Sequence, residues 1–428
     1  MGIWELYPQH AVTDTQFRLA NLYSGCHGAR MSQISLGNRP QLLFPARFTY
    51  VDLLRGLSAV AVLFFHFRMF YPDGNSLGPQ TFAPDHQPLF TLLWPLYFNG
   101  NLAVQFFWAL SGFVFMTTYS GQERKVSGGR FFVWRFSRLY PLHFVTLIYL
   151  AFLQWISLRT TGSFSVVPIN DAYHFFLQLP LASSWGFEAG GSFNTPIWSV
   201  SVEVLIYLVF YAYVRAGRTG PIASVVMVGL FFAISRVVHS PIFTCGELFF
   251  IGCLLFRVIE RLVRFPARTS GLIAFIALGL TIAAAAFLSA RGHSPIPIIM
   301  FATLPATLLA TAVIDLYRSP MSDRWHWVGD ITYSTYLVHL PLIVTTVLIG
   351  RWIGVPYGWP DHPVVLPVYL IAVIMLGMVV HKRFELPAQD AIRRLYRQRL
   401  NYQSGMTPQS SDCPPLLQTQ DAGSVSRR

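Results

Sequence analysis

The chain has 428 residues, of which 53% are hydrophobic and 12% are charged, and its formal net charge is +12. A soluble globular protein carries about a quarter charged residues, so too few charges are present to cover a water-exposed surface. The composition excludes a soluble multidomain protein and predicts an all-α, polytopic integral membrane protein. The basic residues separate long apolar runs and form no aromatic-lined basic face, so nucleic acid is not an expected partner.

Ten apolar runs are long enough to cross a bilayer as helices, because about 20 residues span its hydrocarbon core. They lie near residues 50–71, 98–119, 140–158, 197–214, 222–238, 243–259, 270–289, 297–316, 331–350 and 364–384. A shorter apolar stretch, 172–187, contains Pro180, which favours a re-entrant or interfacial helix.

The distribution of basic residues predicts that both chain ends lie in the cytoplasm. In that orientation most of the 31 Lys and Arg residues fall in cytoplasmic segments, as the positive-inside rule requires. Only four basic residues fall in exterior segments: Arg159, Arg236, Arg291 and Arg351. The exterior segments include two long loops, 72–97 and 159–196, and loops of this length are often functional.

Three regions follow from this pattern. Residues 1–49 are expected to form a disordered cytoplasmic lead, 50–386 the membrane domain, and 387–428 a basic and then disordered cytoplasmic tail. The first apolar run begins too late for a cleaved signal peptide, and Met31 is an alternative initiator. The four cysteines show no metal-ligand spacing, so no metal site is expected.

The first span carries two ionisable residues, Arg55 and His66. Their separation of eleven residues places them within roughly 20° of one helical face and about 16 Å apart along it. A charge in hydrocarbon needs a partner or a wet cavity, and an imidazole exchanges protons near neutral pH. The pair therefore indicates a functional polar stripe. The alternative is a snorkelling Arg55 and an interfacial His66 with a structural partner.

Other spans carry further candidates. Glu203 lies about two turns inside the fourth span, at a depth similar to that of His66. There it orients the imidazole and stabilises its protonated form, contacts the acceptor, or forms a structural ion pair between two helices. Arg135 and Arg138 are spaced to project from one side of a short helix, and paired guanidinium groups suit phosphates. Anchoring to anionic lipid is the alternative for that pair. For Ser111 the residues themselves favour packing, and for His339 they favour packing or hydrogen bonding.

Taken in order, these motifs resemble the acyltransferase-3 family of membrane O-acyltransferases. The resemblance covers about Tyr50 to Leu386. Its markers are Arg55 and His66; Phe106-Phe107 with Ser111-Gly112-Phe113; Arg135-x-x-Arg138 followed by Pro141; Trp185 and Asn194; Trp198-Ser199-x-Ser201-x-Glu203; and Tyr333-Ser334-x-Tyr336-Leu337-x-His339-x-Pro341. The position before the Phe pair is often acidic in the family but is Gln105 here, so no carboxylate role is carried over to it.

The resemblance implies an enzyme of the bacterial inner membrane that uses acyl-CoA, commonly acetyl-CoA, as a co-substrate, with no permanently bound cofactor. The implied acceptor is a hydroxyl of a glycan or lipid-linked saccharide at the exterior side. His66, Glu203 and Arg55 are the expected catalytic residues, and Arg135 and Arg138 are expected to bind the donor. Substrate binding is expected at Ser111, Asn194, Trp198, Ser199 and His339.

The predicted reaction is direct transfer, in which His66 takes the proton of the acceptor hydroxyl and Arg55 steadies the pantetheine arm or the developing oxyanion. A two-step route through acyl-His66 is the alternative. A transporter or flippase of a lipid-linked saccharide is the rival function, although no internal repeat of the transporter type is visible. A membrane sensor with a degenerate site is a weaker third interpretation. The sequence does not specify the oligomeric state.

Overall fold

The computed structural model describes residues 47–71, 84–121, 124–318, 325–356 and 358–403. Within these ranges the regular structure is helical, and the sole extended pairing is one isolated bridge between Ile169 and Ser192. The all-α prediction is confirmed for this part of the chain. Most of the expected lead and tail, and part of the first exterior loop, lie outside the described residues.

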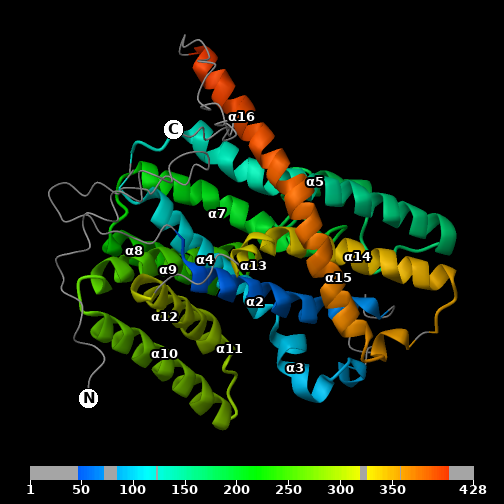
Figure 1. Cartoon of the computed structure of the whole chain (residues 1–428), viewed down its shortest axis with the longest axis horizontal. Coiled ribbons are helices and arrows are strands. Elements are labelled where there is room, and N and C mark those ends of the chain that lie inside the picture. Colours follow the sequence, from blue (N-terminus) through cyan, green and yellow to red (C-terminus); the bar gives the residue numbers. More distant parts are fainter. Residues whose placement is uncertain (1–46, 72–83, 122–123, 319–324, 357, 404–428) are drawn as a thin grey trace, which may run out of the picture. The chain divides into compact units, whose positions relative to one another are not determined.

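The described helices appear in Figure 1. In chain order they are α2 (Thr49–His66), α3 (Phe90–Asn99), α4 (Leu102–Tyr119), α5 (Gly128–Thr161), α6 (Ala172–Gln178), α7 (Trp198–Arg215), α8 (Pro221–Val237), α9 (Pro241–Leu262), α10 (Ala267–Ala290), α11 (Ile296–Ile298), α12 (Leu304–Tyr317), α13 (His326–Asp330), α14 (Thr332–Trp352), α15 (Val365–Val380) and α16 (Leu386–Gln403).

Nine helical segments in the described ranges are long and apolar enough to cross a membrane, and they coincide with nine of the predicted spans. The remaining prediction, 222–238, corresponds to α8, which at 17 residues is slightly shorter. The chain is therefore a multi-pass membrane protein. The described residues from Arg47 to Arg394 belong to one compact unit, which contains the site described below. Of the second unit, the structure describes residues 395–403.

Proline and glycine set several helix ends. Pro221 and Pro241 stand in the first turns of α8 and α9, where a missing N–H costs nothing. Gly162 follows α5 and Gly292 follows the end of α10, both with φ of +74°, a conformation in which glycine lacks the penalty of a side chain. These signals explain why most span boundaries could be predicted within a few residues.

Two elements differ from the prediction. The predicted exterior loop contains a helix, α3, which includes Pro95 and therefore reads as irregular in the sequence. The short helix expected for Arg135 and Arg138 is instead the first part of α5, which runs for 34 residues. Pro141 lies inside α5 without ending it, as neighbouring helices permit within a membrane protein. Both arginines therefore sit on the same continuous helix as the third span.

Helices α4 and α9 make the most extensive contact between two helices in the described unit. They meet at two glycines, because a Cβ atom on Gly112 would overlap the carbonyl oxygen of Phe249. A Cβ atom on Gly252 would likewise overlap the carbonyl oxygen of Ala109. The two backbones thus touch directly, as small residues allow at helix interfaces in membranes. In contrast, α10 leaves apolar residues such as Leu272 and Leu280 exposed, which suits contact with lipid.

Candidate active site

A cavity of about 170 Å³ lies among five helices, α2, α4, α5, α7 and α14. One side is apolar and comes mainly from α4, which contributes Phe107, Trp108 and Leu110. The other sides are polar. The polar lining residues are Arg55, Ser111, Arg135, Arg138, Ser199, Glu203, Tyr207, Thr332, Tyr333 and Tyr336.

The arginines on α5 reach the cavity from the same helix face, as their spacing predicts. The Arg135 guanidinium carbon lies 4.0 Å from the ring centroid of Phe115, a cation–π arrangement. The buried Nε of Arg135 has no hydrogen-bond partner within the described part of the chain. Such a group retains capacity to donate to a ligand in the cavity.

Glu203 provides the negative charge of the cavity lining. Its carboxylate accepts a hydrogen bond of 2.8 Å from the Tyr207 hydroxyl, one helical turn further along α7. The Ser111 hydroxyl on α4 bonds the same carboxylate, and the charges of Arg135 and Arg138 act on it. With Arg55, the lining holds three guanidinium groups and one carboxylate, so it favours an anionic ligand.

His66 and His339 form a second group beside the cavity. Their ring centroids are 4.8 Å apart, and both rings are buried. Nδ1 of His66 bonds the carbonyl of Val62 at 3.0 Å, and Nδ1 of His339 bonds the carbonyl of Tyr336 at 2.6 Å. A carbonyl only accepts, so in each neutral imidazole Nδ1 donates and Nε2 keeps its lone pair. Nε2 of His339 has no partner among the described residues.

Tyr336 connects the histidines to the cavity. Its ring lines the cavity, and its centroid is 5.7 Å from that of His339. Its hydroxyl donates to the carbonyl of Pro196, and the Ser199 hydroxyl donates to the Tyr336 oxygen at 2.8 Å. The contacts therefore lead from Ser199 at the cavity through Tyr336 and His339 to His66.

The structure divides the predicted residues into two sets. Arg55, Arg135, Arg138, Glu203, Ser111 and Ser199 line the cavity, whereas His66, Asn194, Trp198 and His339 do not. Asn194 donates to Thr146 at 3.1 Å and to the Leu337 carbonyl at 3.3 Å, and Trp198 packs edge-on against Trp108. No hydrogen bond within the described ranges joins Glu203 to His66. Orientation of His66 by Glu203 therefore stays a prediction without a direct contact.

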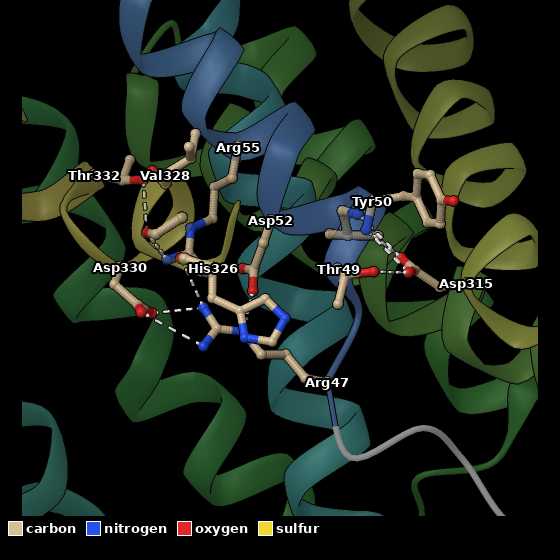
Figure 2. Close-up of polar contacts among 12 residues, drawn as sticks. Arg47, Thr49, Tyr50, Asp52, Arg55, Asp315, His326, Val328, Asp330 and Thr332 are labelled. Carbon is tan, nitrogen blue, oxygen red and sulfur yellow. Dashed lines mark hydrogen bonds and ion pairs between the residues drawn. The ribbon is translucent and has the colours of Figure 1, made fainter. Parts of the chain in front are cut away.

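One residue of the cavity lining, Tyr207, and one partner of a lining residue, Asp52, were not singled out from the sequence. Tyr207 lies four positions after Glu203, and Asp52 lies three positions before Arg55. Both spacings place the partners on one helix face, so the same helical geometry that paired Arg55 with His66 could have found them. Asp52 bonds Arg55 at 2.7 Å, and Arg55 also donates to the carbonyl of Gly329 (Figure 2).

The chain belongs to the acyltransferase-3 family, whose acyltransferase-domain model matches residues 48–382. It is 27% identical to acyltransferase MdmB of Streptomyces mycarofaciens, with 85% of this chain and 96% of that protein aligned. It is also 27% identical to protein 2 in the picA locus of Rhizobium radiobacter, with 45% of this chain and 93% of that protein aligned. No solved structure matches the chain significantly. The protein is a membrane acyltransferase.

Proposed function

We propose that the protein transfers an acyl group, foremost acetyl, from cytoplasmic acyl-CoA to a hydroxyl of a glycan or lipid-linked saccharide at the exterior side of the inner membrane. The observation that best supports this proposal is the cavity, whose lining contains the guanidinium groups of Arg55, Arg135 and Arg138 and one carboxylate, that of Glu203. Asp52 offsets the charge of Arg55, so Arg135 and Arg138 together with Glu203 leave one positive charge in excess at the lining, which favours an anionic ligand. Coenzyme A supplies such an anion in its phosphates.

The donor arginines fit this role by geometry. Arg135 and Arg138 share one face of α5 at the cavity. Guanidinium groups bind phosphate oxygens through two parallel N–H bonds, which an ammonium group does not reproduce. On α2, Arg55 lies about 16 Å from His66. In this proposal Arg55 therefore contacts the phosphate or pantetheine part of the donor, and the thioester lies nearer to His66.

His66 is the proposed general base. Because Nδ1 donates to the Val62 carbonyl, Nε2 is the atom that accepts a proton. The acceptor oxygen attacks the thioester carbonyl carbon while its proton passes to Nε2. The tetrahedral adduct then expels the thiolate of coenzyme A, which takes the proton from the imidazolium. The products are an ester and the free thiol, so no further reactant is consumed.

The acceptor side is proposed from position. Ser199 and Tyr336 stand between the cavity and the histidines, with Trp198 and Asn194 beside them. Hydroxyl and amide groups next to an aromatic ring suit a sugar, whose hydroxyls need partners and whose ring faces are apolar. A cytoplasmic location of both chain ends, proposed from the basic residues, places the α5 arginines at the donor side.

The test uses membranes from cells that express the protein and from cells that carry an empty vector. Radiolabelled acetyl-CoA should label glycan or lipid only in the first, and His66→Ala should remove the labelling. His293→Ala, which changes an exposed histidine after α10, is the matched control and should retain it. Labelling of the protein by donor alone would indicate the acyl-His66 route. Movement of glycan without labelling would contradict the proposal in favour of transport.

A further inference from the structure

The first turn of α2 is flanked by two carboxylates with different partners. Asp315, from α12, accepts hydrogen bonds from the backbone N–H groups of Tyr50 and Val51 and from the Thr49 hydroxyl, at 2.9 to 3.1 Å. The first N–H groups of a helix have no partner within the helix, so Asp315 caps α2 from a neighbouring helix. This carboxylate is structural and does not contact a cation among these partners.

Asp52 faces cations instead. One of its oxygens accepts from Arg55 at 2.7 Å, and the other accepts from Nε of Arg47 at 2.5 Å. Its side chain is 10% exposed, whereas the exposed fraction is 20% for Arg55 and 34% for Arg47. The carboxylate therefore bridges two guanidinium groups at a place largely shielded from water, where such bonds are stronger than at a surface.

Both ends of this bridge attach to α13, as Figure 2 shows. Arg47 bonds Asp330 at 2.6 Å and the carbonyl of His326 at 3.1 Å. Arg55 donates to the carbonyl of Gly329. The contacts thus form a series from Asp330 to Arg47, Asp52 and Arg55 and back to α13. The two positive and two negative charges in this series cancel. Arg55 is thus held at two points, by Asp52 on its own helix and by α13.

Glycine makes this geometry possible. A Cβ atom on Gly329 would lie 2.8 Å from the Cβ, Cγ and Oδ1 atoms of Asp52. Likewise, a Cβ atom on Gly56 would overlap the side chain of Val328. Helices α2 and α13 therefore approach so closely that the Asp52 carboxylate is confined between them, and it presents a fixed oxygen to Arg55.

From these contacts we infer that Asp52 is a positioning residue, which holds the Arg55 guanidinium at the cavity in the orientation that receives the acyl donor. A guanidinium has five N–H groups, and Arg55 uses two of them in the bonds to Asp52 and Gly329. Among the described residues, the other three N–H groups of this cavity-lining residue have no hydrogen-bond acceptor, so they can donate to a ligand. The inference rests on the proposed donor site but concerns a residue outside the cavity lining.

The kinetic test compares the two carboxylates of the α2 turn. Asp52→Asn should lower kcat/KM for the acyl donor about 10- to 100-fold, mainly through KM, and Asp52→Glu should restore part of it. Asp315→Asn is the matched control: it should lower thermal stability while the donor KM stays unchanged. In an Arg55→Gln background Asp52→Asn should add no further loss, because Asp52 acts through Arg55. Additive losses, or equal donor kinetics for the two Asn variants, would overturn the inference.

A second readout does not depend on the donor. Phenylglyoxal modifies accessible guanidinium groups, and peptide mass spectrometry reports the modified fraction of Arg55 in the full-length protein. Asp52→Asn should raise this fraction several-fold, and Asp315→Asn should leave it unchanged. Equal labelling in the wild type and both variants would refute positioning by Asp52. If the wild type transfers no acyl group from any acyl-CoA, the proposed function fails, yet this labelling still decides the role of Asp52.

Discussion

The imidazole rings of His66 and His339 lie 4.8 Å apart, although 273 positions separate them in the chain. Each ring donates Nδ1–H to a carbonyl of its own helix, so each Nε2 is an acceptor. Two basic nitrogens therefore occupy one buried place next to Tyr336. Nε2 of His339 has no partner among the described residues, and the proposed proton transfer would use such a lone pair.

The two histidines should differ in their kinetic roles. His66→Ala should lower kcat by about 10²- to 10⁴-fold, the usual loss when a general base is removed. His339→Leu removes a single acceptor and should raise the acceptor KM about tenfold, the cost of one hydrogen bond, with kcat changed little. Steady-state kinetics against acceptor concentration check both. Full activity of His339→Leu would assign His339 to packing alone.

Arg135 should not tolerate lysine. Its guanidinium lies over the Phe115 ring and has a buried Nε without a partner in the described ranges, and lysine has neither the planar group that stacks on a ring nor this Nε–H donor. Arg135→Lys should raise the donor KM about tenfold or more. Arg130→Lys is the matched control on the same helix, because Arg130 does not line the cavity. Equal donor KM values for the two variants would contradict a donor-binding role.

Glu203 should matter for its charge more than for its bond to Tyr207. Glu203→Gln removes the carboxylate on which the charges of Arg135 and Arg138 act, so activity and thermal stability should both fall, the latter by more than about 1 kcal/mol. Tyr207→Phe keeps the carboxylate and should cost about 1 kcal/mol. Thermal unfolding in detergent measures both. A larger effect for Tyr207→Phe would contradict this ranking.

Helix α6 should lose its cap in acid. Asp171 accepts from the backbone N–H and from Nδ1 of His174, both at 2.8 Å, and these bonds lower the pKa of Asp171 below its ordinary value. Because the folded pKa lies below the unfolded value of about 3.9, the contribution is present above that pH and is lost as the pH falls through the folded pKa. Limited proteolysis of residues 163–194 should therefore increase in acid.

Asp171→Asn provides the control for this pH dependence. Asparagine caps a helix about as well as aspartate but has no carboxylate to protonate. The variant should lose the acid-induced rise in proteolysis while α6 stays protected near neutral pH. The same acid-induced rise in both proteins would show that another group controls the segment.

Much of the fold could be predicted because bilayer thickness imposes a length on each apolar run. The prediction of α10, near 270–289, needs only composition and the following Gly292. The prediction missed α3, because Pro95 resembles a loop signal unless the surrounding helices are known. The prediction also split α5 into a short helix and a separate span. The start of an apolar run marks where the chain enters the hydrocarbon core of the membrane and not where the helix begins.

The site was predicted less completely, for a geometric reason. Sequence spacing gives the face that a residue occupies, and it correctly placed Arg135 with Arg138. Spacing does not give the rotation of each helix or its neighbours. Arg55 and His66 share a stripe on α2, yet only Arg55 lines the cavity. The contact between Arg47 and Asp330 joins positions 283 apart, which no local pattern reveals.

The glycine contact between α4 and α9 has a consequence for how substrates reach the cavity. The apolar side of the cavity comes mainly from α4. Gly112 and Gly252 allow the backbone of α4 to contact the backbone of α9 directly. Helix α4 is therefore expected to shift little relative to α9 when a substrate enters the cavity. Widening of the cavity is therefore expected at its other walls, which come from α2, α5, α7 and α14.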